Sequence, residues 1–223
     1  MGYFEPGYDS KRRFISYWHQ TNEIISLDPQ SVLEIGIGNG MVSNYLKGRG
    51  LDVTTLDIKE RLRPDIIASV LDIPLGDSTF DVVACYEVLE HMEYQEFGVA
   101  LSEIYRVCKR TALISLPDQN RAIRILLHVP VLGEKQWMVS TPRIKKRKLD
   151  VYHKWEIGRW GYPLKKIVSD MGAVGFSLSN TYRVFEIPYH RFFILEKGNE
   201  GQTTPTREAR YREHQEDAGI PPA

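Results

Sequence analysis

Two hydrophobic periodicities alternate along the first half of the chain, one typical of buried strands and the other typical of amphipathic helices. Five short apolar runs have the length of buried strands: 31–35, 51–57, 66–70, 80–86 and 111–116. Three stretches place apolar residues at helical spacing: 10–27, 41–47 and 93–109. Ser10 is a suitable cap for the first helix. Strands that alternate with helices in this way predict an α/β fold built on a parallel sheet.

The alternation stops after residue 116. Residues 117–162 read as an irregular segment that is aromatic and basic, and a helix is predicted over 163–171. Two further strands, 176–185 and 190–196, predict an antiparallel hairpin at the edge of the sheet. Residues 198–223 contain few apolar side chains and predict a solvated, mobile tail.

A glycine-rich turn, Glu34-x-Gly36-x-Gly38-x-Gly40, lies between the first predicted strand and the helix that follows. Glycines allow a tight turn and a close approach of a ligand to the backbone, and the helix beyond them favours an anionic group. A dinucleotide site needs a third glycine one residue later, and a phosphate-binding P-loop needs a following Lys and Ser or Thr. The spacing therefore counts against both of these sites, although a simple packing turn remains an alternative.

Acidic residues follow the next two predicted strands. Asp57 lies about 20 residues beyond the glycines, where a carboxylate accepts hydrogen bonds from a ribose diol in related α/β sites. Asp72 is placed to accept a hydrogen bond from an exocyclic amine, and Ile58 and Ile73 to sandwich a flat base. Each acid alone is as easily explained as a solvated loop residue or a turn cap. Their joint order favours a nucleoside site.

Residues 33–117 resemble the class I S-adenosylmethionine-dependent methyltransferases of the type 11 kind. The glycine turn and Asp57 are followed in the family's order by Asp72-Ile73-Pro74, Phe80-Asp81 and Glu87-Val88-Leu89-Glu90-His91. The resemblance implies a Rossmann-like α/β fold, with a seven-stranded, mostly parallel sheet and helices on both faces. It also implies that the C-terminal hairpin contributes an antiparallel strand to that sheet.

The same resemblance implies a role for each motif residue. S-adenosylmethionine is the expected cofactor and S-adenosylhomocysteine the expected product. The residues implied near the methionine portion are Glu34, Gly36, Gly38, Gly40 and, at the sulfonium end, Glu87. The residues implied around the nucleoside are Asp57 at the ribose, Ile58 along the adenine, and Asp72 and Ile73 at the adenine edge.

Methyl transfer from a sulfonium is a direct displacement, so the protein mainly aligns the nucleophile, the methyl group and the leaving sulfur. A base is needed only where the acceptor holds its proton tightly. Glu87 and His91 are the predicted catalytic residues, and the other candidate bases are Glu90, His153 and Glu156. Glu87, Glu90 and His91 share one face if their turn is helical. Nothing in the sequence completes a ligand set around them, so no metal is predicted.

The segment after the fifth strand is expected to select the acceptor. Residues 141–166 hold nine Lys or Arg and two Asp or Glu, a net charge of +7, and Trp137, Trp155 and Trp160 lie in or near this stretch. Such a segment suits a phosphorylated, lipid-linked or nucleic-acid acceptor, and equally suits a solvated lid with packed tryptophans. The apolar run 125–132 predicts an acceptor pocket, a membrane contact or a cover for the core.

Composition narrows the class of protein further. The 223 residues carry 29 basic and 29 acidic side chains, so there is no global attraction to polyanions. The two cysteines, Cys85 and Cys108, form no CxxC motif, which disfavours a disulfide scaffold and a cysteine zinc site. Residues 1–6 do not begin a signal peptide and no apolar run spans a bilayer, so a cytoplasmic protein is predicted.

Together these observations predict a helical N-terminal cap (1–30), a methyltransferase domain (31–197) with an acceptor-binding insertion (117–162), and the tail (198–223). The predicted activity is S-adenosylmethionine-dependent methylation of a small-molecule or lipid- or carrier-linked acceptor, and the basic segment is compatible with an anionic one. The alternatives are an RNA or protein methyltransferase that uses residues 141–166, and a cofactor-binding module without catalysis. The sequence leaves the oligomeric state open.

Overall fold

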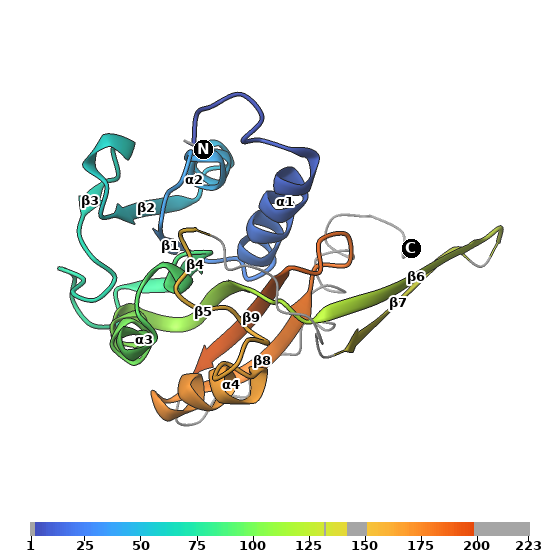
Figure 1. Cartoon of the computed structure of the whole chain (residues 1–223). Coiled ribbons are helices and arrows are strands. Elements are labelled where there is room, and N and C mark those ends of the chain that lie inside the picture. Colours follow the sequence, from blue (N-terminus) through green and yellow to red (C-terminus); the bar gives the residue numbers. More distant parts are fainter. Residues whose placement is uncertain (1–2, 132, 142–150, 199–223) are drawn as a thin grey trace.

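The computed structural model describes residues 3–131, 133–141 and 151–198, and its centre is a seven-stranded sheet (Figure 1). The strands lie in the order β3-β2-β1-β4-β5-β9-β8. Their bounds are β1 Ser31–Ile35, β2 Asp52–Asp57, β3 Ile66–Ile67, β4 Phe80–Tyr86, β5 Cys108–Pro117, β8 Phe176–Arg183 and β9 His190–Lys197. The first five are parallel, whereas β9 runs antiparallel to both β5 and β8. The predicted Rossmann-like α/β fold and its C-terminal hairpin are confirmed.

Helices cover both faces of this sheet, as Figure 1 shows. The four helices are α1 Lys11–Ile25, α2 Met41–Gly48, α3 Phe97–Val107 and α4 Leu164–Ala173. Successive strand residues point to opposite faces, so Val32 packs in the core beneath α1 and α2 while Leu33 packs in the core beneath α3 and α4. Strands buried on both faces explain why β1 and β4 are almost continuously apolar.

Two local boundaries differ from the sequence expectations in an informative way. β3 covers only Ile66–Ile67, although the N–H of Ala68 still donates to the Asp57 carbonyl of β2. The helix expected to begin at residue 93 starts with a 3₁₀ turn, η3 (Tyr94–Glu96), which Glu93 and Glu96 close as a capping box. Two more 3₁₀ turns are η1 Glu60–Leu62 and η2 Leu89–His91.

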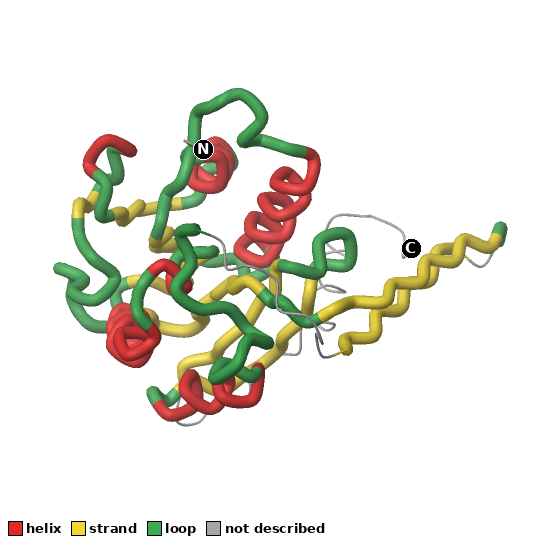
Figure 2. The backbone as a smooth tube through the Cα atoms, viewed as in Figure 1, coloured by secondary structure: helices red, strands yellow, loops and turns green. Residues whose placement is uncertain are grey.

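The expectation of an irregular segment over 117–162 is wrong for its first half. Residues Arg121–Val129 (β6) and Gly133–Thr141 (β7) pair as an antiparallel hairpin that projects from the body of the protein (Figure 2). We call these two strands the arm. Val131 and Gly133, on either side of an undescribed residue, both have positive φ and turn the chain at the tip.

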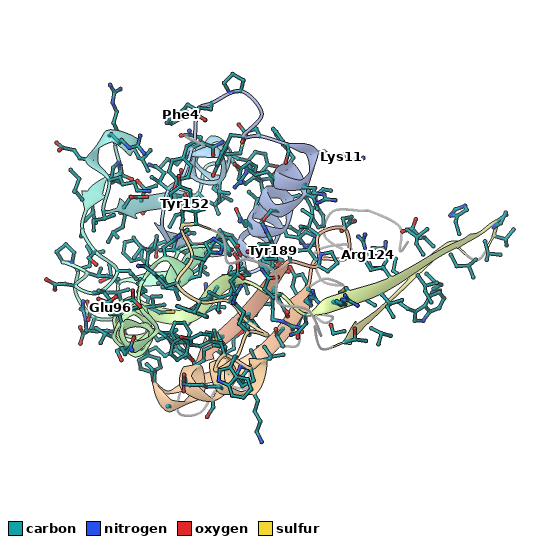
Figure 3. The ribbon with its side chains drawn as sticks, viewed as in Figure 1. Phe4, Lys11, Glu96, Arg124, Tyr152 and Tyr189 are labelled. Atoms are coloured by element: carbon teal, nitrogen blue, oxygen red, sulfur yellow. The ribbon has the colours of Figure 1, made fainter. Side chains whose placement is uncertain are left out.

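Hydrogen bonds at its base hold the arm to the rest of the molecule. Arg183 at the end of β8 donates to the carbonyl of Asn120 at 2.6 Å and to Oγ of Ser140 at 2.9 Å. Arg124, which lies at the root of β6 in Figure 3, donates to the carbonyls of Phe185 and Glu186. These charged donors fix where the arm leaves the sheet.

Other sequence expectations have mixed outcomes. Trp155 does not face an acceptor: it is fully buried and packs edge-on against Tyr94 and Phe97, so it belongs to the core. Cys85 and Cys108 are buried free thiols. The basic run at 143–148 and the tail from residue 199 lie outside the described residues. Among the described residues, no helix combines the length and apolar character that crossing a bilayer requires.

Candidate functional site

The glycine turn after β1 has a backbone that only glycine adopts without strain. Gly36, Gly38 and Gly40 have φ values of +84°, +57° and +76°. A Cβ at Gly36 would lie 2.3 Å from Cγ2 of Val88, in the turn that follows β4. The loop therefore needs glycine at position 36 both for its conformation and for its close approach to the neighbouring turn.

Glu34, at the penultimate position of β1, is a buried carboxyl group. Its Oε2 has no hydrogen-bond partner within the described ranges. Burial raises the pKa of Glu34 to about 8, against the opposing effects of hydrogen bonds with Ser43 and the charge of Lys47. An acid in this state responds strongly to a cation placed beside it.

Asp57 ends β2 on the same edge of the sheet as the glycine turn. The side chain is 8% exposed. Its Oδ1 accepts a hydrogen bond from the backbone N–H of Lys59 at 2.8 Å, which orients the carboxylate at the strand end. Asp57 is thus held in place without an ion pair to any described residue, so it can accept hydrogen bonds from a diol.

The two isoleucines expected around the base occupy different environments. Ile58 is 69% exposed beside Asp57 and offers a surface for a flat ring. Ile73 is 2% exposed and packs in the core, so a sandwich between the two side chains is not formed. Asp72 is exposed and its N–H donates to the Ser69 carbonyl.

Two residues of α3 fix the turn that carries Asp72. Glu103 accepts the N–H of Ile73 at 2.8 Å, and Arg106 donates to the carbonyls of Ile73 at 2.8 Å and of Leu75 at 2.6 Å. Arg106 also pairs with Glu103 at 2.7 Å. This positioning pair was missed by sequence reasoning, because the partners lie about 30 residues apart and a helical Glu and Arg at i,i+3 usually form only a surface pair.

The N-terminal segment reaches over the glycine turn, a contact that the sequence did not predict. Asp9 accepts a hydrogen bond from Nδ2 of Asn39 at 2.9 Å. The nearest atoms to a Cβ at Gly38 belong to the ring of Tyr3, at 3.9 Å. Nζ of Lys59 lies 5.1 Å from the centre of the same ring. Tyr3 therefore stands between the glycine turn and the loop after Asp57.

Glu87 follows β4 and has a strained backbone, with φ of +53°. Its Oε1 accepts a hydrogen bond from Oγ of Ser115 at 2.9 Å, and its Oε2 lies 4.0 Å from Nε2 of His190. A non-glycine residue in this conformation marks a site where the surrounding structure imposes the geometry. His190, at the start of β9, was missed because the antiparallel strand brings it to this edge from far along the chain.

Glu87 does not share a helical face with Glu90 and His91, because the helical turn is the single 3₁₀ turn η2, which covers only Leu89–His91. Glu90 is fully buried and His91 is exposed. Nδ1 of His91 lies 3.0 Å from the carbonyl oxygen of Tyr152. Burial lowers the pKa of His91, although this carbonyl and the charge of Glu87 oppose the effect.

A cluster of polar side chains around the buried Glu156 lies close to this turn. Oε1 of Glu156 accepts a hydrogen bond from the hydroxyl of Tyr189, labelled in Figure 3, and contacts Nδ1 of His153 at 2.9 Å. Gln119 donates to Oε2. Burial alone would raise the pKa of Glu156, but the hydrogen bonds from His153, Tyr189 and Gln119 outweigh it and leave the pKa below its ordinary value.

The strand order, the glycine turn and the acids at the ends of β2 and β4 define a Rossmann-like fold of the class I methyltransferase type. Residues 33–116 match the family model described as a methyltransferase domain. Solved S-adenosylmethionine-dependent methyltransferases share the fold of the chain.

Two of the similar proteins are methyltransferases of known name. The chain is 27% identical over 119 residues to the ubiquinone biosynthesis O-methyltransferase of Rickettsia bellii, covering 47% of this chain and 48% of that protein. It spans about half the length of the curated relatives that it matches first. The magnesium protoporphyrin IX methyltransferase of Synechocystis with bound S-adenosylhomocysteine has a TM-score of 0.56 at 16% identity, over 88% of this chain and 91% of that one.

A second solved structure includes an acceptor. The 1,6-didemethyltoxoflavin-N1-methyltransferase of Burkholderia thailandensis, with bound 1,6-didemethyltoxoflavin and S-adenosylhomocysteine, has a TM-score of 0.51 at 16% identity. The match covers 84% of this chain and 87% of that one. At this identity the likeness shows the fold that the two proteins share.

Proposed function

We propose that this protein is an active S-adenosylmethionine-dependent methyltransferase. The observation that carries the proposal is the placement of the glycine turn, Asp57 and Glu87, which follow β1, β2 and β4. These three strands are neighbours and parallel, so the three features meet at one edge of the sheet. Ligands of open α/β sheets bind at the carboxyl ends of the strands.

The cofactor supplies a methyl group that is already activated for displacement. The residues of this chain then bind and orient the cofactor. Asp57 accepts hydrogen bonds from the two ribose hydroxyls, and the glycine turn allows the cofactor to approach the backbone closely. Glu34 and Glu87 are placed to face the positive charge of the methionine portion. His190, whose Nε2 lies 4.0 Å from Oε2 of Glu87, is a further candidate to accept a proton from an acceptor hydroxyl or amine. Glu87 and His91 stay predictions as catalytic residues.

Calorimetry with S-adenosylmethionine and S-adenosylhomocysteine tests the cofactor directly. Both are expected to bind with one site per chain, and binding of neither would overturn the proposal. Release of S-adenosylhomocysteine in the presence of candidate acceptors then separates an enzyme from a cofactor-binding module. Binding without turnover on any acceptor from a broad small-molecule set would favour the module.

We propose further that the acceptor is a small molecule or a lipid-linked molecule, and that the arm serves the lipid-linked case. The two solved methyltransferases are named for small-molecule acceptors, 1,6-didemethyltoxoflavin and magnesium protoporphyrin IX. Alternation along β6 and β7 sorts the side chains of this arm onto two faces. One face carries five large apolar side chains that are each at least half exposed: Ile123, Ile125, Leu127, Trp137 and Val139.

Charge distinguishes a lipid surface from a second copy of the chain as the partner of this apolar face. Its charged residues are Arg121 and Lys135, whereas the acidic Glu134 lies on the opposite face. Two copies packed by this face would oppose basic residues without an acid between them. An anionic membrane surface neutralises both, and Trp137 suits the boundary between headgroups and acyl chains.

Vesicle sedimentation tests this assignment. The double variant Ile125→Gln/Trp137→Gln is expected to bind vesicles containing anionic lipid about tenfold or more weakly than the parent, because two buried apolar contacts of a few kcal/mol are partly lost. Leu126→Gln is the matched control, since Leu126 is 52% exposed on the opposite face. Equal binding by all three proteins, or no binding by the parent, would contradict the proposal.

A further inference from the structure

Three potential metal ligands from two segments of the chain meet next to the turn that follows β4. Glu90 and His91 belong to η2, and His153 comes from the segment before Trp155. One ligand atom from each residue lies within 4.8 Å of those of the other two. The N–H of Lys154 donates to the carbonyl of Glu90 at 2.8 Å, which holds the two segments together.

The hydrogen bonds of the two histidines set their tautomers. The carbonyl oxygen of Tyr152 can only accept, so Nδ1 of His91 must carry the proton in that 3.0 Å contact. Nδ1 of His153 likewise donates to the carboxylate of Glu156 at 2.9 Å. In the neutral form each ring then presents an unprotonated Nε2. A metal-binding histidine usually shows this arrangement, with its other nitrogen donating to a carbonyl or a carboxylate.

The separation between ligand atoms also fits a bound ion. Nε2 of His153 lies 3.8 Å from Oε1 of Glu90. That distance is too long for a hydrogen bond. Two ligands on one tetrahedral zinc ion, with bonds of about 2.0–2.1 Å, lie about 3.4 Å apart. A small inward movement of the side chains would therefore complete the coordination.

Buried carboxylates lie on both sides of His153. Glu90 is fully buried, and a second buried carboxylate, Glu156, lies behind His153. Oε2 of Glu156 also lies 3.4 Å from Nη1 of Arg159, so Glu156 already has a cationic partner and serves here as the acceptor that orients the ring of His153.

We infer that Glu90, His91 and His153 bind a divalent transition-metal ion, with zinc as the best match to two imidazoles and a carboxylate. Three protein ligands of this kind leave one coordination position open in zinc sites. Sequence reasoning found Glu90 and His91 but no further ligand, because His153 lies some 60 residues away and only the fold brings it to η2. The inference does not depend on methyl transfer.

Titration of the chelator-treated full chain with Co²⁺, followed by visible absorption, tests the site without reference to activity. We expect one Co²⁺ per chain with the intense bands of a tetrahedral ion, displaced by zinc. His91→Ala and His153→Ala are each expected to weaken binding about 100-fold or more, since a ligand change exceeds the 10–100-fold effect of an outer-shell change. His128→Ala is the control, because His128 is exposed on the arm.

Two results would overturn the inference: a chain that gives no tetrahedral Co²⁺ spectrum, or variants that bind Co²⁺ as tightly as the parent. Far-ultraviolet circular dichroism of each metal-free variant shows whether it is folded, and His91→Ala keeps the test decisive because His91 is exposed. Failure of this test leaves the cofactor calorimetry unaffected, so the two proposals fail separately.

Discussion

Replacing Asp57 by alanine is expected to weaken S-adenosylmethionine binding about 100-fold or more. The carboxylate is positioned to accept hydrogen bonds from both ribose hydroxyls. Two hydrogen bonds to a charged group together contribute about 3 kcal/mol or more to binding. The Lys59 N–H that donates to Oδ1 would also lose its acceptor, so the loop beyond β2 would be less well ordered. Calorimetry with S-adenosylmethionine and with S-adenosylhomocysteine measures the loss, which should be similar for both because they share the ribose.

Two further variants distinguish the loss of the ribose contact from a loss of affinity caused by disruption of the structure. Asp57→Asn keeps an oxygen that can accept the Lys59 N–H but loses the negative charge, so its affinity should fall between those of the parent and Asp57→Ala. Asp52→Ala removes an exposed acid at the other end of β2 and should leave the affinity unchanged. An Asp57→Ala protein that binds as tightly as the parent would refute the assignment of Asp57 to the ribose.

Most of the sheet could be predicted from sequence because its strands are local and apolar. β1 and β4 are buried on both faces, so each reads as a short hydrophobic run whatever its neighbours are. Asp57 could be placed for the same reason, since a residue at the end of a parallel strand lies at the ligand-binding edge. The glycine turn could be predicted as well, because glycine is the residue that a backbone with positive φ favours and its positions are read directly from the sequence.

The arm could not be predicted in the same way. Leu126 interrupts the polar face that a simple alternation would require, so 125–132 reads as one largely apolar run. Both strands are exposed, and exposed apolar strands are rare enough to count against the assignment. Trp155 was misplaced because a tryptophan beside basic residues suggests recognition, whereas its burial depends on Tyr94 and Phe97 from a distant turn.

The residues missed at the candidate site are all placed by long-range contacts. His190 meets Glu87 only because β9 pairs with β5, and the register puts His190 opposite Pro117. Tyr3 reaches Lys59 across more than 50 residues of chain. Local spacing carries no signal for such contacts, so they follow only once the strand order is known.

Glu34→Gln is expected to stabilise the cofactor-free protein at alkaline pH and to weaken cofactor binding. In the folded protein the pKa of Glu34 is raised to about 8 from an ordinary value of 4.5. Between these values the folded state holds a proton that the unfolded state has lost, so the free energy of unfolding falls as the pH rises and becomes level above about pH 8. The decrease amounts to a few kcal/mol, on the order of 1.4 kcal/mol for each pH unit. Glutamine has no proton to lose, so this part of the pH dependence should disappear.

The same group should link cofactor binding to pH in the opposite direction. The ammonium and sulfonium of S-adenosylmethionine carry positive charge, and a cation near Glu34 favours the ionised carboxylate. Binding to the parent below about pH 8 should therefore release a proton, and affinity should rise with pH up to that value. Urea unfolding across a pH series, together with calorimetry in two buffers that differ in ionisation enthalpy, measures both effects. Glu60→Gln, at an exposed acid in η1, is the control, and a parent whose pH dependence matches that of Glu34→Gln would show that Glu34 does not titrate in this range.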